Sequence, residues 1–236
     1  QGWSVGGRVA VLPHVSCGEC RYCRAGQENF CVSGGHLGWV IGVQGQGGLA
    51  ESVVAPASCL FAVPEGVTDA QAALAEPVAV AARAAGQVTC APDEPVTVVG
   101  AGPIGLLISL ILRHKGFADV TIMERSSGRR AIAESLGLRA TAPADDAASP
   151  AGERPAVVVD ASGSPAAIAM GVRLLRNRGK IVLVGLPGDE VPMDVAYLVL
   201  HEITVAGAAG YNRADFAHAL ELLAKWAIPT DRIITE

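Results

Sequence analysis

The residues with the clearest chemistry are four cysteines that lie within fifteen residues, in the segment CGECRYCRAGQENFC. Gaps of two residues bring thiolates together around one ion, and the longer last gap lets the chain return to close a tetrahedron. Four thiolate ligands are typical of a structural zinc site, because they leave no coordination position open for chemistry. We therefore predict a structural zinc ion on Cys17, Cys20, Cys23 and Cys31.

Two other interpretations of this cluster stay open. A pair of disulfides would require an oxidising compartment, and the first residues, QGWSVGGRVAVLPH, show no basic segment followed by an apolar core, as a secretory signal would. A zinc module for nucleic acid would require a recognition helix, and only Arg21 and Arg24 stand between the cysteines. We interpret Cys59 and Cys90, which are isolated, as buried thiols without a role.

A glycine-rich turn, VVGAGPIG, is the second chemical feature. It follows an apolar strand and opens a helix, and Glu124 lies 19 positions beyond its last glycine, at the end of the next strand. This combination predicts a dinucleotide site. Gly100 permits the tight turn, Gly102 lets the backbone approach a pyrophosphate, and Gly105 lets the helix pack on the strand. Free N–H groups at the helix N-terminus favour the phosphates.

Glu124 also bears on which dinucleotide is bound. Its carboxylate is placed to accept hydrogen bonds from the adenosine ribose and would repel a 2′-phosphate, which favours NAD over NADP. Arg125, Arg129 and Arg130 leave NADP open, since guanidinium groups bind phosphate well. A solvated acid at a strand end is the simpler alternative for Glu124.

Two later glycine turns, ASG (161–163) and LVGL (183–186), also end strands of the predicted sheet. Such strand ends face the ligand crevice in open α/β sheets. They are candidate walls for the rest of the dinucleotide, with ordinary turn chemistry as the alternative.

Glu76 is an acid in an Ala-rich run, directly before Pro77. Thr68 and Gln71 fit a capping box that starts a helix, which should kink or restart at Pro77. Glu76 is either a solvent-facing carboxylate or a metal ligand or proton-handling group, and both remain open.

Two regions of the chain must position these groups. Up to about residue 64, the segments RVAVLP, LAESVVAP and CLFAVP predict short strands, with a long loop over 33–48 and neither helix nor strand among the cysteines. From Pro95 onwards, strands and helices alternate, which predicts a doubly wound parallel α/β sheet. The strands are expected within 96–100, 119–123, 138–141, 156–160, 180–185 and 203–207, the helices within 103–116, 128–137, 164–177 and 213–226, and a connection at 143–155.

Composition narrows the class of protein. Half of the 236 residues are hydrophobic, so disorder is a poor interpretation. The formal net charge is −5, so the sequence lacks the excess of basic residues that is typical of nucleic-acid binding. The longest apolar run, Pro103 to Leu112, is too short to cross a bilayer. The absence of an initial Met and the abrupt end, DRIITE, lead us to expect a piece of a longer protein.

Five motifs follow one another along the chain: the four-cysteine segment, GGLAESVVAP, the AEP break, VVGAGPIG and GKIVLVGLPG. In that order they resemble the zinc-containing medium-chain alcohol dehydrogenases, in particular the sorbitol, polyol and threonine dehydrogenase branch, over essentially the whole chain. The resemblance implies a partial GroES-like β-rich domain over 1–75, with a zinc lobe at 17–31, and a Rossmann dinucleotide-binding domain over 76–236.

The resemblance also implies residue roles. Glu76 corresponds to the acidic position that lies at the catalytic zinc in sorbitol-type members, and Arg129 pairs with Glu124 at the adenosine ribose. Further cofactor contacts are implied at Pro103, Ile104, Ser162, Gly163, Val184, Gly185, Leu186, Ala208 and Ala209. The family's earlier Cys and GHE segment, which bind the catalytic zinc, are not in this sequence, so we expect that ion only in the full-length protein.

The expected function is therefore a zinc-dependent oxidoreductase that transfers hydride between a secondary alcohol or polyol, sugar-like or cyclitol-like, and NAD. Catalytic zinc would act as a Lewis acid on the bound alcohol. The alternative is a non-catalytic or zinc-independent NAD(P)-binding remnant of the same family. We also expect a cytoplasmic homodimer or homotetramer, joined through the sheet edge at ITVAG, with neither nucleic-acid nor membrane partners.

Overall fold

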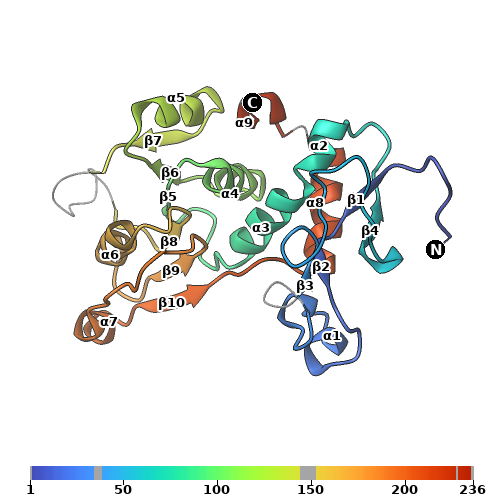
Figure 1. The fold of residues 1–236 in the computed structure, drawn as a ribbon. Helices are drawn as coiled ribbons and strands as arrows, with labels where there is room; N and C mark the ends of the chain where they lie inside the picture. The colour runs from blue at the N-terminus through green and yellow to red at the C-terminus, as the bar shows by residue number, and fades with distance from the viewer. Residues whose placement is uncertain (1, 35–38, 144–152, 227, 235–236) are drawn as a thin grey trace. The chain divides into compact units, whose positions relative to one another are not determined.

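The computed structural model describes residues 2–34, 39–143, 153–226 and 228–234 (Figure 1). The chain divides into two compact units, one of residues 1–80 with 210–230 and one of residues 81–209 with 231–236. The predicted loop at 33–48 and connection at 143–155 lie partly outside the described residues. Within the described part of the loop, residues 39–40 form a short strand, so the prediction is wrong there.

The first unit contains two short antiparallel sheets. In one, β1 (Val9–Val11) pairs with β4 (Leu60–Ala62), and in the other, β2 (His14–Val15) pairs with β3 (Trp39–Val40). The predicted strand at residues 49–56 is wrong: no described strand lies beside this segment, and a strand requires a partner for its backbone groups.

The cysteine segment is more regular than expected. It contains a one-turn helix, α1 (Arg21–Arg24), and a 3₁₀ turn, η1 (Glu28–Phe30); a second 3₁₀ turn, η2 (Ala57–Cys59), precedes β4. The expectation of neither helix nor strand here is therefore wrong. The physical reason is that residues three apart lie on one face of a helical turn. The turn α1 therefore brings Cys20, its N-cap residue, close to Cys23.

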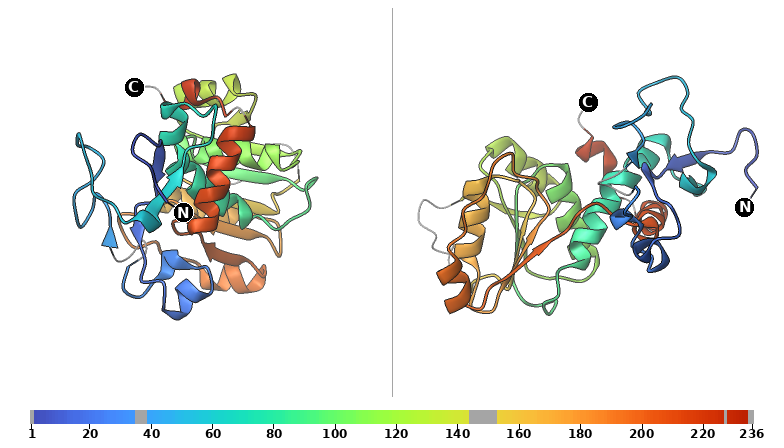
Figure 2. Two further views of the ribbon diagram at one scale, coloured as in Figure 1. Left: turned by 90° about the vertical axis from the view of Figure 1, so that its right-hand side faces the viewer. Right: turned by 60° about the horizontal axis from the view of Figure 1, so that its bottom comes forward.

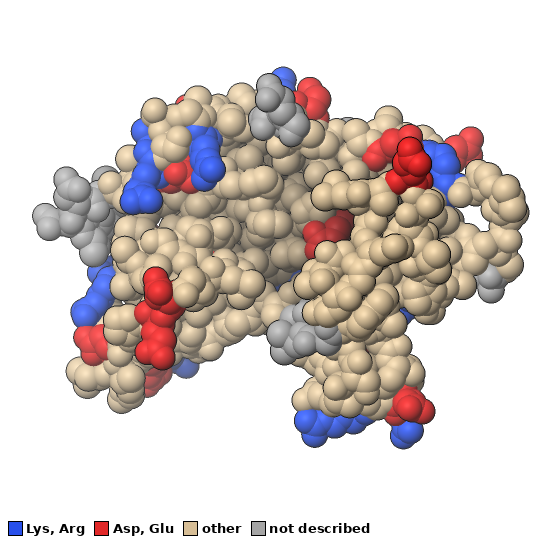
Figure 3. All heavy atoms as spheres, in the orientation of Figure 1, with Lys and Arg blue, Asp and Glu red and all other residues tan. Residues whose placement is uncertain are grey.

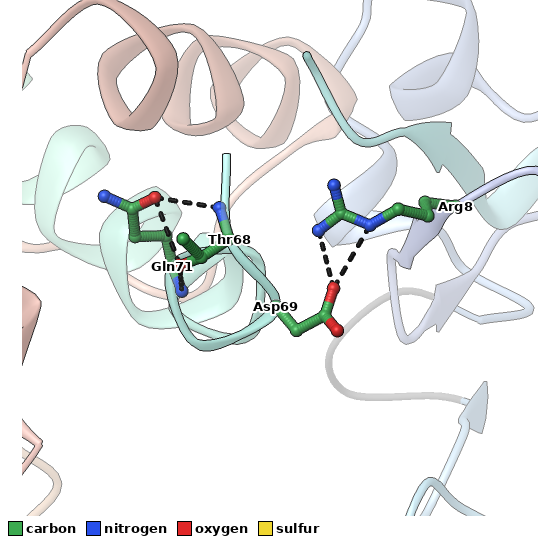
Figure 4. A network of polar contacts seen from close by, with 4 residues as sticks. All are labelled: Arg8, Thr68, Asp69 and Gln71. Carbon is green, nitrogen blue, oxygen red and sulfur yellow. Dashed lines mark hydrogen bonds and ion pairs between the residues drawn. The ribbon is translucent and has the colours of Figure 1, made fainter. Parts of the chain in front are cut away.

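The predicted helix break before Pro77 is confirmed. The first piece, α2 (Asp69–Ala73), starts with the expected capping box: Gln71 N–H donates to Thr68 Oγ1 at 3.2 Å, and Thr68 N–H donates to Gln71 Oε1 at 2.9 Å (Figure 4). A second helix, α3 (Ala75–Gly86), restarts at once. Pro77 lies in its first turn, where the N–H that proline lacks has no helical acceptor.

The second unit is built on one sheet of six parallel strands, in the order β10-β9-β8-β5-β6-β7. All six strands predicted from the sequence are present, and the order is that of a Rossmann fold. Burial on both faces explains the continuous apolar runs of the central strands. The bounds are β5 (Val96–Val99), β6 (Val120–Met123), β7 (Arg139–Thr141), β8 (Val157–Asp160), β9 (Lys180–Leu183) and β10 (Thr204–Gly207).

Helices cover both faces of this sheet, as Figure 2 shows. The strand order reverses between β5 and β8, so right-handed crossovers place α4 and α5 on one face and α6 on the other. This reversal creates a crevice at the carboxyl ends of the strands. The bounds are α4 (Pro103–His114), α5 (Ser127–Ser135) and α6 (Pro165–Leu174), as predicted, and α7 (Val195–Leu200) and α9 (Thr230–Ile233), which the sequence did not predict.

The helix α8 (Arg213–Lys225) belongs to the first unit, not to the second. Its buried face includes Phe216, whose ring lies 5.0 Å from that of Phe61 in β4. The units thus differ from the predicted boundary at 75/76 in two ways: the division falls after Val80, and the chain returns to the first unit at Gly210. The predicted domain extents remain a prediction.

Acidic and basic side chains form small separate groups on the face shown in Figure 3, and other residues cover most of it. This distribution offers no continuous basic surface on that face, in line with the net charge. In the part of the chain that the structure describes, every helix is too short or too polar to cross a bilayer.

Candidate functional site

The four predicted zinc ligands come together in the first unit. Their sulfur atoms all lie within 4.8 Å of one another, with Sγ–Sγ distances of 3.9 Å for Cys17–Cys23, 3.5 Å for Cys20–Cys23 and 3.5 Å for Cys17–Cys31. Tetrahedral zinc with Zn–S bonds of about 2.3 Å requires sulfur separations of about 3.8 Å. All four thiols are free. The donor set and spacing therefore fit a structural zinc ion and not a pair of disulfides.

Backbone groups also prepare the sulfurs for a metal. Cys17 N–H donates to Cys31 Sγ at 3.3 Å, and Cys20 N–H donates to Cys17 Sγ at 3.4 Å. N–H groups of Cys23 and Val32 lower the pKa of Cys20 to about 6. Because zinc binds the thiolate form, these contacts favour the ligand state of Cys20, whereas burial raises the pKa of Cys23 to about 12.

In the second unit, the glycine turn has the geometry expected of a pyrophosphate site. Gly100 has φ +103°, in the left-handed region that favours glycine, and a Cβ at Gly105 would lie 1.9 Å from the Gly100 carbonyl oxygen. A Cβ at Gly102 would meet nothing within 4 Å, so this residue faces open space at the N-cap of α4. The turn thus presents bare backbone and helix N–H groups to a ligand.

Glu124 is held at the end of β6 by two backbone donors. Its Oε2 accepts from Ala101 N–H at 2.9 Å and its Oε1 accepts from Ser126 N–H at 2.8 Å. Burial alone would raise the pKa of this carboxyl, but these N–H groups and the nearby Arg129 outweigh it and lower the pKa below 4.5. Glu124 is therefore ionised at neutral pH, which suits acceptance of hydrogen bonds from ribose hydroxyls.

The three arginines near Glu124 differ in what their guanidinium groups contact. Arg130 donates from one nitrogen to the carbonyl oxygens of Glu124 and Arg125, at 2.8 and 2.7 Å, and so supports the backbone. Arg125 and Arg129 line the pocket beside Glu124. Of these three arginines, Arg125 and Arg129 are therefore the two that border the space where a phosphate would bind.

The pocket has a volume of about 350 Å³ and lies at the carboxyl ends of β5, β6 and β8. It brings together part of the predicted cofactor set, namely Gly100, Gly102, Glu124, Arg129 and Ser162. The other predicted residues lie outside its lining. Pro103, Ile104 and Gly105 form the first turn of α4, while Gly163, Val184, Gly185, Leu186, Ala208 and Ala209 follow the ends of β8, β9 and β10.

Asp160 is a residue that the sequence analysis did not assign. It is fully buried at the end of β8, and its carboxylate accepts from Ser162 and Gly163. The available signal was an acid that ends an apolar strand directly before a glycine turn.

Glu76 lies in the first turn of α3, in the first unit, and lines a cavity of about 540 Å³ together with Arg8, Asp69 and Phe216. More than a third of the surface of Glu76 is exposed, but the surrounding protein removes water from its carboxyl group. This desolvation raises the pKa of Glu76, while the nearby Tyr211 hydroxyl opposes the rise. Tyr211 is buried, and its ring lies 4.7 Å from that of His14. The contact between Tyr211 and Glu76 falls short of hydrogen-bond geometry.

The surroundings of Glu76 do not complete a catalytic zinc site. Within the described ranges, only the four cysteines form a group of three or more possible metal ligands. Among the described residues, Glu76 is thus a single candidate ligand.

Sequence comparisons agree with both parts of this architecture. Residues 1–65 match the family model for the alcohol dehydrogenase GroES-like domain, and residues 103–225 match that for zinc-binding dehydrogenases. The chain is 35% identical over 237 residues to L-galactonate-5-dehydrogenase of Escherichia coli (strain K12), covering 98% of this chain and 68% of that protein.

Solved structures with this fold include two with a bound dinucleotide. An alcohol dehydrogenase from E. coli CFT073, in complex with NADH, superposes with a TM-score of 0.86 at 30% identity, covering 97% of this chain and 68% of the other. A protein described as a zinc-binding dehydrogenase from Sinorhizobium meliloti 1021, bound to NADP, gives 0.89 at 27% identity, covering 100% and 70%.

The class defined by these matches is that of zinc-binding dehydrogenases with a GroES-like and a Rossmann portion. The chain belongs to the medium-chain zinc-containing alcohol dehydrogenase family. It spans 62% to 68% of the length of the first curated relatives it matches.

Proposed function

We propose that this chain is the zinc-lobe and coenzyme-binding portion of an oxidoreductase that transfers hydride between a secondary alcohol and NAD(P). The observation that carries the proposal is the pocket in which the open Gly102 turn and the ionised Glu124 face the same space. The substrate class is a polyol or sugar acid, supported by the name of the galactonate dehydrogenase relative. No observation favours the alternative of a non-catalytic remnant.

The roles of the chain's own residues follow from their positions. The N–H groups at the start of α4 bind the pyrophosphate, and Glu124 with Arg129 binds the adenosine ribose. The strand-end residues Val184 to Leu186, with Ala208 and Ala209, border the nicotinamide half. The bound dinucleotide supplies the hydride acceptor.

NAD is the proposed coenzyme. The lowered pKa of Glu124 keeps a negative charge where a 2′-phosphate would lie, and like charges in one pocket repel. Arg125 and Arg129 line the same pocket and lessen this repulsion. We therefore expect NADPH to bind, but more weakly than NADH.

Two metal roles are proposed. Cys17, Cys20, Cys23 and Cys31 hold a structural zinc ion, and in the full-length protein Glu76 lies at the catalytic zinc. Four thiolates complete the coordination of the first ion, so that ion contributes stability and no open position for substrate.

The proposed location is the cytoplasm, where the thiols of the zinc lobe stay reduced. The proposed assembly is a homodimer or homotetramer that uses β10, the last strand in the sheet order. Its Val205 is 37% exposed, and α7 next to it in sequence exposes Val195, Val199 and Leu200. A free strand edge with apolar neighbours favours pairing with a second copy. Light scattering that shows a monomer at micromolar concentration would contradict this assembly.

The coenzyme proposal is tested by fluorescence titration of the zinc-loaded chain with NADH and with NADPH. We expect saturable binding of both, tighter for NADH. The variant Glu124→Ala should lose this preference, because it removes the charge that repels the 2′-phosphate. A folded wild-type chain that binds neither NADH nor NADPH would overturn the proposed function.

A further inference from the structure

Asp160 is a buried acid for which the proposed coenzyme chemistry has no use. Its exposed fraction is 0%. Its Oδ1 accepts from the Ser162 hydroxyl at 2.6 Å and from Ser162 N–H at 3.3 Å, and its Oδ2 accepts from Gly163 N–H at 3.0 Å. Among the residues that the structure describes, no Lys, Arg or His forms an ion pair with it. The carboxylate therefore serves the turn that follows it.

The hydrogen-bond pattern requires a carboxylate at this position. An O–H···O distance of 2.6 Å is typical of a charge-assisted bond, and a buried charge is tolerated when donors surround it. Both carboxylate oxygens accept, whereas an Asn side chain offers one accepting oxygen and one donating nitrogen. An amide at residue 160 would leave either Gly163 or Ser162 without an acceptor.

The backbone of Asp160 joins the same turn to the next strand. Its carbonyl oxygen accepts from Val184 N–H at 2.9 Å and from Gly185 N–H at 3.0 Å. The two turns are in close contact, since a Cβ at Gly185 would lie 2.1 Å from Gly163 N. On the other side, a Cβ at Gly100 would lie 3.3 Å from Ser162 N. The turn at 161–163 is thus confined between the ends of β5 and β9.

This turn is also a wall of the coenzyme pocket. Ala161, Ser162 and Ser164 line the pocket together with Glu124 and Arg129. Ser162 Oγ, which donates to Asp160, accepts from Ser164 N–H at 3.2 Å. A continuous set of hydrogen bonds therefore runs from the Asp160 carboxylate to the N-cap of α6.

We propose that Asp160 is a positioning residue whose carboxylate holds residues 161–164 in the conformation that forms the adenosine-side wall of the dinucleotide pocket. The inference rests on the proposed function, because it assigns the pocket to a dinucleotide. Asp160 does not line the pocket, and it acts through Ser162 and Gly163.

The test is the affinity of the full zinc-loaded chain for ADP, measured by calorimetry, together with amide hydrogen exchange. Asp160→Asn should weaken ADP binding about tenfold, because one buried N–H or O–H loses its acceptor and the ligand must then order the turn. Ser162→Ala should weaken ADP binding about threefold, because it removes a single hydroxyl from the set.

The double variant separates positioning from a general loss of structure. If Asp160 acts through Ser162, the double variant should bind ADP about as weakly as Asp160→Asn alone, because coupled residues are not additive. Exchange should accelerate at Gly163 and Ser164 and stay unchanged along β5. Asp93→Asn, an exposed residue before β5, is the control and should bind ADP like the wild type.

Several results would overturn the inference. They are ADP affinity within twofold of wild type in Asp160→Asn, additive effects in the double variant, or faster exchange throughout β5 and β8. Should Asp160→Asn fail to fold, Ser162→Ala decides alone by the same two readouts. A wild-type chain that binds neither ADP nor NADH would refute the proposed function instead, which is a distinct outcome.

Discussion

The side-chain amide of Asn212 donates to the carbonyl oxygen of Gly26 at 2.9 Å, although 186 positions separate the two residues. Gly26 lies in the zinc lobe, between Cys23 and Cys31. Asn212 is the N-cap of α8, and its Oδ1 accepts from Asp215 N–H at 2.8 Å. One side chain thus caps a helix with its oxygen and binds the zinc lobe with its nitrogen.

The variant Asn212→Asp should separate these two roles. Aspartate keeps the capping oxygen but cannot donate to Gly26, so the free energy of unfolding of the zinc-loaded chain should fall by about 1 kcal/mol. Zinc should also pass to a chelator faster, since the lobe loses a support. Denaturant unfolding and absorbance of a metal indicator measure the two effects. Asn177→Asp, at an exposed position, should change neither, and an unchanged zinc-release rate in Asn212→Asp would contradict the role of this bond.

Substitution of one zinc ligand should abolish metal binding. Cys23→Ser removes a buried thiolate from a site that, among the described residues, has only Cys17, Cys20 and Cys31 as its other ligands. Because binding energy of structural zinc is folding energy, we expect zinc content to fall from one ion per chain to near zero and the first unit to unfold at lower denaturant. Metal analysis of purified protein is the measurement. Cys90→Ser, outside the lobe, should keep its zinc, and a Cys23→Ser chain with full zinc would refute the ligand set.

Two glycines of the nucleotide turn should respond differently to alanine. In Gly105→Ala the new methyl group would lie 1.9 Å from the Gly100 carbonyl oxygen, so the fold itself must shift and stability should fall by about 1–3 kcal/mol. In Gly102→Ala the methyl group meets no protein atom within 4 Å. That variant should keep wild-type stability but lose ADP affinity. Thermal unfolding and ADP calorimetry on both variants check this contrast, and equal stability of the two would contradict it.

The pH dependence of stability should contain a contribution from Glu124. Its pKa in the folded chain is lowered below 4.5, so its ionised form stabilises the fold above pH 4.5, and this stabilisation is lost as the pH falls through the folded pKa. Glu124→Gln lacks the titrating group. The free energy of unfolding of wild type relative to Glu124→Gln should therefore be largest near neutral pH and should decrease on acidification. A difference that grows as the pH falls would show the opposite sign.

The sequence pattern was sufficient to predict structural features that depend on residues close together in the chain. The six parallel strands could be predicted because strands covered on both faces must be apolar throughout, and α2 because Thr68 and Gln71 satisfy each other's backbone groups locally. The zinc cluster and the turn around Gly100 could be predicted from the sequence for the same reason. Ligand spacing and backbone sterics act over a few residues.

Features that depend on contacts between residues far apart in the chain could not be predicted from the sequence. Residues 49–56 carry a strand-like pattern but have no described strand to pair with, and α8 follows the last Rossmann strand in the chain but packs with the first unit through Phe216. The contact between Asn212 and Gly26 belongs to the same class.

The sequence by itself determined which groups can bind zinc and a dinucleotide, because thiolate spacing and the glycine turn are local properties. Only the tertiary structure decided what holds those groups in place. The clearest case is the turn after Asp160. Its three hydrogen-bond donors lie only two and three residues away in the chain, but the burial of Asp160 and the confinement of the turn arise only when β5, β8 and β9 lie side by side. A hydrogen-bonded turn can form locally, but its carboxylate is removed from water only when the neighbouring strands cover it, and that covering requires the whole sheet.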